Sequence, residues 1–206
     1  MHKVDIVIPV HNNFEITKRC IETVLDSVVE NTSRIGQLII VDDQSTDGDL
    51  KEYLNNEEGK FYYPPAELDP PYINFVKTPE RSYYSKAVNY SYNFVTSKYM
   101  LLLSNDTKIY SRDWVKTMIQ EFEEEGNVGL LSPSIVGYYN PEPVSNKGFH
   151  YTRIGGCSWL IESEYFGKLG GLRVDGKYAH WHSDMEFCDR IIADGKKYRN
   201  VICIHS

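Results

Sequence analysis

Three short, mostly apolar segments constrain the fold most, because each ends abruptly in polar or acidic residues. Such segments are typical of strands buried in an α/β sheet. Open α/β sheets bind ligands outside the carboxyl ends of their strands, so the polar residues are candidates for a binding site, although each one alone is also explained by an ordinary turn. The segments and the residues that follow them are Val4–Val10 with His11-Asn12, Leu38–Val41 with Asp42-Asp43, and Met100–Leu103 with Ser104-Asn105-Asp106.

The segment between the first two strands predicts an amphipathic helix over Glu15–Glu30, because its apolar residues recur at a helical spacing. They are Ile16, Cys20, Val24 and Val28. Two strands joined by such a helix form a βαβ unit, with parallel strands and a right-handed crossover. The carboxyl ends of the strands therefore meet at one edge of the sheet, where we expect the polar residues to line a common rim.

The rest of the chain continues this alternation, and 206 residues correspond to a single α/β domain. Two Pro/Gly-rich segments without a usable period, Asn55–Pro71 and Tyr138–Thr152, predict surface loops. The remaining predicted elements are strands over Tyr72–Lys77, Val128–Val136 and Val201–Ile204, and helices over Ser82–Ser97, Ser111–Glu125 and from about Asp184 to Gly195.

Composition excludes several classes of protein. A formal net charge of −7 without a basic patch argues against a nucleic-acid polymer as a partner. No apolar run approaches the ~20 residues of a transmembrane helix, and the N-terminus has no signal-peptide pattern. The four cysteines form no C-x-x-C pair, which favours reduced thiols and a cytoplasmic location.

Five ordered motifs resemble those of family 2 glycosyltransferases of the GT-A type. They are Ile6–Asn12, Val41–Gly48, Leu103–Thr107, Gly170–Leu172 and Ser183–Arg190. The resemblance implies a Rossmann-like domain with a central, mostly parallel mixed sheet flanked by helices. It also implies a nucleotide-sugar-binding half over residues 1–107 and an acceptor-binding, catalytic half over residues 108–206.

The family also implies roles for individual residues on the donor side. Asp43 would contact the nucleoside base, with Asp42 beside it, and Asp106 would bind the metal as the last acid of a D-x-D motif whose first acid is here Ser104. His205 resembles a histidine that some members place on the metal. The further expected donor contacts are Pro9, Val10, His11, Asn12, Arg81, Lys86, Asn89 and Asn105, although Lys86 and Asn89 are also explained as exposed polar residues of a helix.

Asp184 resembles the family's general base, and Glu186 a second acid whose role varies. Both are also explained as acidic residues that complement the dipole of a helix N-terminus. One base without a second carboxylate nucleophile favours a single displacement with inversion. A glycosidase pair of carboxylates is disfavoured, because a hydrolase of that kind has no use for the nucleoside-side motifs.

We therefore expect an inverting glycosyltransferase that moves a sugar from a UDP-sugar to a hydroxyl of a glycan or another acceptor, with Mn²⁺ or Mg²⁺. The alternatives are a nucleotidyltransferase, for which a glycine- and basic-rich phosphate loop is missing, and a non-catalytic carbohydrate- or nucleotide-binding module. A zinc pair at His180 and His182 lacks a clustered third ligand, and no G-x-G-x-x-G follows the first strand. Because only Ser206 follows His205, we also expect the chain to be part of a larger multidomain protein.

Overall fold

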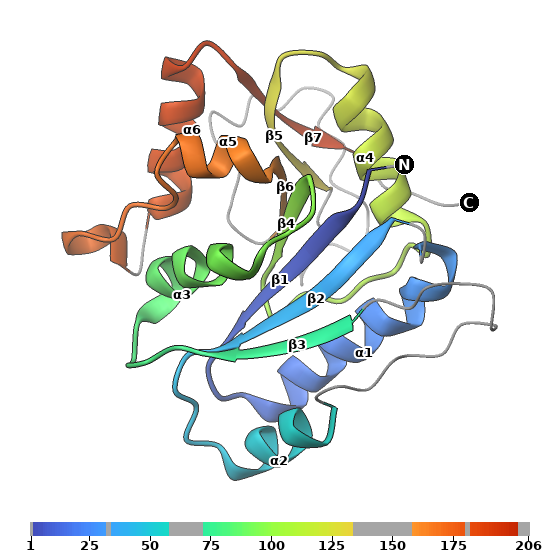
Figure 1. Cartoon of the computed structure of the whole chain (residues 1–206), viewed down its shortest axis with the longest axis vertical. Coiled ribbons are helices and arrows are strands. Elements are labelled where there is room, and N and C mark those ends of the chain that lie inside the picture. Colours follow the sequence, from blue (N-terminus) through green and yellow to red (C-terminus); the bar gives the residue numbers. More distant parts are fainter. Residues whose placement is uncertain (1, 32–33, 58–71, 134–157, 180–181, 202–206) are drawn as a thin grey trace, which may run out of the picture.

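The computed structural model describes residues 2–31, 34–57, 72–133, 158–179 and 182–201. A seven-stranded sheet runs through them in the order β3-β2-β1-β4-β6-β5-β7, with helices on both faces (Figure 1). This arrangement confirms the predicted α/β class and the mostly parallel mixed sheet. Among the described residues, no helix combines the length and the apolar character needed to cross a membrane.

The elements alternate along the chain as strands and helices. The strands are β1 (Val4–Val10), β2 (Ile35–Asp42), β3 (Tyr72–Lys77), β4 (Tyr99–Leu103), β5 (Val128–Pro133), β6 (Ser158–Glu162) and β7 (Lys197–Val201). The helices are α1 (Phe14–Asn31), α2 (Gly48–Glu57), α3 (Tyr83–Ser91), α4 (Trp114–Glu124), α5 (Ser163–Lys168) and α6 (Ser183–Ala193), with short 3-10 helices η1 (Tyr92–Phe94) and η2 (Gly176–Ala179).

Strand direction divides the sheet into two parts. β3, β2, β1 and β4 are parallel neighbours, so the carboxyl ends of β1, β2 and β4 share one edge, as predicted. β6 is antiparallel to both β4 and β5, and β7 then pairs with β5 in parallel. The antiparallel β6 therefore joins the two halves of the chain within one sheet.

Each face of the sheet is covered by its own hydrophobic core. On one face, β-strand side chains pack with α1, α2 and α4 through residues such as Ile21, Leu50 and Trp114. On the other face, α3, α5 and α6 supply Val88, Phe166 and Phe187. The strands that carry the candidate site are thus buried on both sides, which holds their polar ends in place.

The buried face of α1 differs from the predicted one. Ile16 is 41% exposed, whereas the side chains of Thr17, Cys20, Ile21, Val24 and Leu25 are buried. A strict spacing of four residues drifts around a helix with 3.6 residues per turn, so the true stripe combines spacings of three and four. Val28 is among the side chains that the structure does not describe.

Several predicted boundaries were wrong, and three elements were missed. α2 occupies residues assigned to a turn and the start of a loop; Asp47 caps it, since its Oδ1 accepts the N–H groups of Asp49 and Leu50 at 3.1 and 3.2 Å. β6 and α5 were not predicted, and the helix predicted over Ser82–Ser97 ends as α3 at Ser91. The last strand begins at Lys197 rather than Val201. The loop predicted over Tyr138–Thr152, and most of that over Asn55–Pro71, lie outside the described residues.

A buried carboxylate organises the amino edge of the sheet. Asp5 is fully buried in β1, and it accepts the backbone N–H groups of Thr96 and Ser97 at 2.7 and 3.0 Å and the side-chain amide of Gln37 at 3.0 Å. The hydroxyl of Ser97 donates to its other oxygen at 2.6 Å. Because an added Cβ at Gly36 would collide with Asp5 and Ser97, this edge requires a glycine there.

Asp5→Asn should lower the free energy of unfolding by about 2–4 kcal/mol, because an amide replaces one acceptor with a donor that faces other donors. Urea unfolding followed by circular dichroism measures the change. Asp26→Asn, on the exposed side of α1, is the matched control and should stay within about 0.5 kcal/mol of the wild type. Equal stabilities of the two variants would contradict the role given to Asp5.

Candidate functional site

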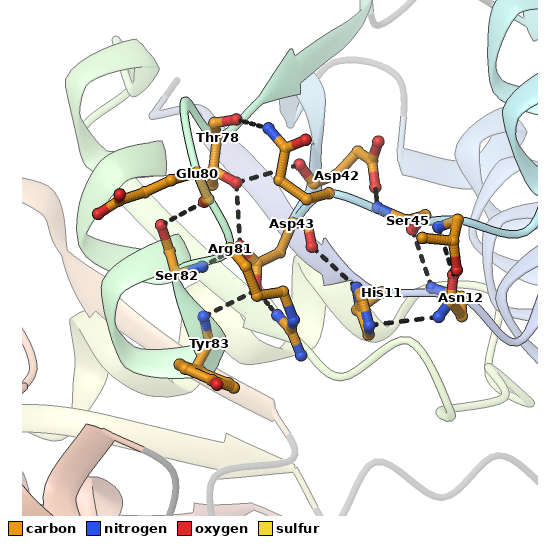
Figure 2. A network of polar contacts seen from close by, with 12 residues as sticks. His11, Asn12, Asp42, Asp43, Ser45, Thr78, Glu80, Arg81, Ser82 and Tyr83 are labelled. Atoms are coloured by element: carbon orange, nitrogen blue, oxygen red, sulfur yellow. Dashed lines mark hydrogen bonds and ion pairs between the residues drawn. The ribbon is translucent and has the colours of Figure 1, made fainter.

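The ends of β1 and β2 are joined by hydrogen bonds of Asn12 (Figure 2). Its backbone N–H donates to Ser45 Oγ at 2.8 Å, and its side-chain oxygen accepts the N–H groups of Thr46 and Asp47 at 2.7 and 3.0 Å. Asn12 has a positive φ of 58°, a conformation that asparagine tolerates better than most residues. Asp47 closes the connection, since its Oδ2 accepts the N–H of Phe14 at 3.2 Å.

His11 is held in one neutral tautomer. Its Nδ1 donates to the carbonyl oxygen of Asp43 at 2.8 Å, and its Nε2 accepts from the side-chain amide of Asn12 at 3.2 Å. Protonation would turn Nε2 into a second donor that faces another donor. Burial, and secondly the charge of Arg81, lower the pKa of His11 from its ordinary value.

The carboxylate of Asp43 is the centre of the network. Asp43 is only 2% exposed, and Thr78 Oγ1 and the N–H of Ser82 donate to its Oδ1 at 2.9 and 2.6 Å. Its Oδ2 accepts the N–H of Tyr83 at 2.7 Å and forms an ion pair with Arg81. These four partners satisfy the acceptor capacity of a carboxylate, so a ligand can reach it only by displacing one of them.

Arg81 is the accessible partner in this network. Its side chain is 37% exposed, and its guanidinium lies 4.6 Å from the ring centroid of Tyr83, which is itself 40% exposed. The other donors to Asp43 belong to the backbone or to buried Thr78. Arg81 therefore combines the ion pair with a stacking contact at the surface of the site.

The other residues predicted at the ends of β1 and β2 contribute mainly through the backbone. The side chains of Pro9 and Val10 are buried in the strand, and the carbonyl of Val10 accepts the N–H of Asp43 at 2.8 Å. Asp42 is nearly buried, and its Oδ1 accepts the N–H of Ser45 at 2.8 Å. These contacts fix the backbone of the rim, and Arg81 and Tyr83 are exposed beside Asp43.

The turn after β4 lies against the start of α1. Asn105 donates from its side-chain amide to Thr17 Oγ1 at 2.8 Å, and Thr17 in turn donates to the carbonyl of Asn12 at 3.3 Å. Asp106 is exposed, and within the described part of the chain its carboxylate has no hydrogen bond or ion pair. Beneath this turn, burial and the charge of Asp106 raise the pKa of the Cys20 thiol to about 12.

The Gly170-Gly171-Leu172 turn is clamped from two sides. Asn89 on α3 donates to the carbonyl of Leu172 at 2.7 Å and accepts its N–H at 2.8 Å. Arg190 on α6 donates to the carbonyls of Leu169 and Gly171. Glu186 orients Arg190, with Oε2 at 3.1 and 2.8 Å from its Nε and Nη2. Asn89 and Glu186, predicted as donor-binding and catalytic residues, are thus engaged by protein groups.

Asp184 lies in the first turn of α6, where its Oδ1 accepts the N–H of Met185 at 2.8 Å. The preceding η2 segment contacts α3, because Ser85 donates to the carbonyl of Tyr178 at 2.8 Å. The same helix begins with Ser82 and Tyr83 on Asp43, so α3 connects the Asp43 network with the segment that leads into Asp184. Lys86 is exposed on α3 and belongs to a different cleft, beside Asn93.

A metal site is incomplete within the described residues. No group of three His, Cys, Asp or Glu side chains among them could hold a metal ion. Asp106 is the predicted ligand that the structure describes, whereas His205 and the His180 half of the zinc pair lie outside the described residues. The exposed Asp106 carboxylate at this edge fits a hard cation that takes its other ligands from a diphosphate and water.

A model of the family described as glycosyl transferase family 2 matches residues 5–178 of the chain. The chain belongs to glycosyltransferase family 2. No curated protein matches it significantly. The matched region of this family-2 chain includes the Asp43 network, the turn after β4 and the Gly-Gly-Leu turn.

Two solved structures share the fold of the family-2 chain. The mannosyltransferase PcManGT from Pyrobaculum calidifontis, in complex with GDP-Man and Mn²⁺, is 16% identical with a TM-score of 0.70, over 99% of this chain and 56% of that one. S. aureus TarS 1-349 is 14% identical with a TM-score of 0.61, over 86% and 52%. The chain spans about half the length of these proteins. The GT-A type of fold is confirmed.

Several residues of the site were missed by sequence reasoning. Thr78, Ser82 and Tyr83 belong to no recognisable sequence motif. Ser82 and Tyr83 contact Asp43 through their backbone N–H groups, which any residue type provides. Arg190 is the last residue of the Ser183–Arg190 motif and lies four residues after Glu186, a spacing that favours an ion pair on a helix. That spacing was the available evidence for the clamp on the Gly-Gly-Leu turn.

Stability should fall as the pH drops below about 6.5 through the contribution of His11. Its folded-state pKa is lowered, so below the ordinary value of 6.5 the unfolded chain binds a proton that the folded chain does not. Urea unfolding of wild type and His11→Asn at about pH 7.5 and about pH 5.5 measures this, because asparagine keeps a donor near Nδ1 without titrating. The variant should lose less stability between the two values; equal losses would exclude the effect.

Gly171→Ala should destabilise the family-2 domain more than Gly170→Ala. Both glycines have positive φ values (69° and 78°), which cost about 1–2 kcal/mol for alanine. A Cβ at Gly171 would also lie 2.6 Å from Asn89 Oδ1, whereas one at Gly170 meets nothing within 4 Å. The loss of the Asn89–Leu172 bonds should add about 1–2 kcal/mol at Gly171.

A double-mutant cycle tests this explanation by urea unfolding. In an Asn89→Ala background the collision is gone, so Gly171→Ala should cost no more than Gly170→Ala. If the difference between the two glycine variants persists there, Asn89 is not its cause.

Proposed function

We propose that the chain is the donor-binding and catalytic domain of an inverting, divalent-metal-dependent glycosyltransferase. The donor is a nucleotide sugar, with a UDP-sugar as the first choice, and the acceptor is a hydroxyl group of a glycan or another molecule. The observation that carries this proposal is the Asp43 network of Figure 2, which lies at the carboxyl edge of the sheet in a family-2 chain. The cytoplasmic location and the larger multidomain protein remain predictions.

The donor nucleoside would bind where Arg81 and Tyr83 are exposed beside Asp43. Arg81 is the partner that a ligand can displace, because its side chain is 37% exposed whereas the other three donors are backbone groups or buried Thr78. A nucleoside base that replaces it would donate a hydrogen bond to the Asp43 carboxylate, and the released guanidinium would be available for a phosphate oxygen. His11 and Asn12 keep the backbone of both strand ends in position for this exchange.

The exposed carboxylate of Asp106 would hold the cation, together with His205, which lies outside the described residues. A bound cation supplies charge compensation for the departing nucleoside diphosphate. An imidazole in the ligand set would favour Mn²⁺ over Mg²⁺. With so few protein ligands, the metal should bind weakly in the absence of a nucleotide.

Asp184 would act as the base. The acceptor oxygen attacks the anomeric carbon, its proton passes to the Asp184 carboxylate, and the bond from the anomeric carbon to the diphosphate oxygen breaks. One displacement inverts the configuration of the sugar. Glu186 is the other acid in this segment, and its carboxylate is paired with Arg190, which binds the Gly-Gly-Leu turn. This pairing favours Asp184 over Glu186 as the base.

A nucleotide-sugar panel tests the proposal. The chain is incubated with Mn²⁺ and with UDP-glucose, UDP-galactose, UDP-N-acetylglucosamine or GDP-mannose, and released nucleoside diphosphate is measured with and without free sugar acceptors. GDP-mannose is included because PcManGT was solved with it. Diphosphate release identifies a transferase, pyrophosphate-dependent formation of nucleoside triphosphate a nucleotidyltransferase, and thermal stabilisation by donor without turnover a binding module.

Asp184→Asn should lower the rate of sugar transfer by about 10²–10⁴, the range for the loss of a general base. Donor affinity, measured by calorimetry with nucleoside diphosphate and Mn²⁺, should stay unchanged because the substitution is nearly isosteric. Asp189→Asn makes the same change on the exposed side of α6 and should keep the wild-type rate. Transfer by Asp184→Asn at the wild-type rate would exclude Asp184 as the base.

A further inference from the structure

We propose that a cleft on the outer side of α3 is a second carbohydrate site, which binds a segment of an oligosaccharide chain. The cleft has a volume of about 510 Å³ and is open to solvent. This volume is within the roughly 300–1,000 Å³ of small-ligand sites. The lining residues are Pro79, Glu80, Ser82, Lys86, Asn89, Tyr90, Asn93 and Val174.

The cleft lies on the opposite side of the β3–α3 connection from the Asp43 network. Figure 2 shows Arg81 and Tyr83 on one side of this connection, while the side chains of Glu80 and Ser82 point the other way. Glu80 and Ser82 line the cleft. The cleft is therefore separate from the proposed nucleoside site, although the two share residues 79–83 as a common wall.

The polar groups of the cleft match hydroxyl groups better than ions. Glu80 and Lys86 are exposed, and neither has a hydrogen bond or ion pair from its charged group to another described residue. Charges of both signs in one cleft disfavour a simple anion and a simple cation. A sugar hydroxyl both donates and accepts, so it can pair with the carboxylate, the ammonium group and the amide of Asn93.

Apolar surface between these groups suits the C–H face of a pyranose ring. Pro79, Val174 and the ring of Tyr90 line the cleft together with the polar groups. Tyr90 is braced by an edge contact with Phe94, with ring centroids 5.6 Å apart. On the far wall, the Asn89–Leu172 hydrogen bonds hold the backbone two residues before Val174. An aromatic ring with convergent polar groups is the usual composition of such sites.

The inference goes beyond the proposed function, because it requires no transfer activity. An open cleft beside the donor site can hold an oligosaccharide outside the reaction centre, and its shared wall with Arg81 provides a physical link between the two sites. The ligand class is the neutral oligosaccharide; its sugar sequence is left to the experiment.

Nitrogen-15 NMR spectra of the full chain, recorded while cellohexaose, maltohexaose, mannohexaose or chitohexaose is added, test the proposal. We expect at least one of them to shift the amides of Glu80, Lys86, Asn93 and Val174. Calorimetry then gives the dissociation constant for wild type, Glu80→Ala and Asn93→Ala. Each variant should weaken binding about fivefold to tenfold, as expected for one lost hydrogen bond.

Matched controls separate this site from the donor site. Lys51→Ala and Glu52→Ala, exposed on α2, should bind the hexasaccharide like the wild type. UDP with Mn²⁺ should bind to Glu80→Ala and Asn93→Ala with the same affinity as to the wild type. Shifts confined to residues 104–107 or 183–186, equal affinity of the cleft variants and the wild type, or no shift with any of the four hexasaccharides would overturn the proposal.

Discussion

The buried carboxylate of Asp43 is the interaction on which the site depends. A charge this inaccessible is tolerated only when its oxygens are fully hydrogen-bonded, and here the backbone of Ser82 and Tyr83, the hydroxyl of Thr78 and the guanidinium of Arg81 provide those bonds. Together they join the end of β2 to the start of α3. The carbonyl of the same residue holds His11, which brings in the end of β1. The end of β1, the end of β2 and the start of α3 therefore meet at Asp43.

Helix α3 connects the Asp43 network with residues 172 and 178 by hydrogen bonds. Its first turn bonds to Asp43, Ser85 holds the carbonyl of Tyr178, and Asn89 holds both polar groups of the Leu172 backbone. Arg190 completes the clamp from α6. The Gly-Gly-Leu turn thus connects α3 and α6. Both of its glycines have a positive φ, and Gly171 is also required by the closeness of Asn89.

The β3–α3 connection presents different side chains on its two sides. Arg81 and Tyr83 face the proposed nucleoside site, while Glu80 and Ser82 face the cleft that we assign to carbohydrate. A short connection that presents alternate residues to opposite sides can respond to either ligand. Ser82 connects the two sides, because it lines the cleft and donates its N–H to Asp43.

The sequence by itself determined the βαβ core and the shared edge of the strand ends, because apolar runs and helical spacing act locally. The family followed from the resemblance of five ordered motifs, not from these periodicities. β1 and β3 were predicted to the residue, and Asp42, Asp43, His11 and Asn12 do meet in one network. Only the tertiary structure decided that Asn89 is engaged with Leu172 and Asp43 with four donors. It also decided that β6 is antiparallel and that α2 begins at Gly48. Hydrogen bonds between residues 30–90 positions apart depend on how the elements pack, and no local pattern records them.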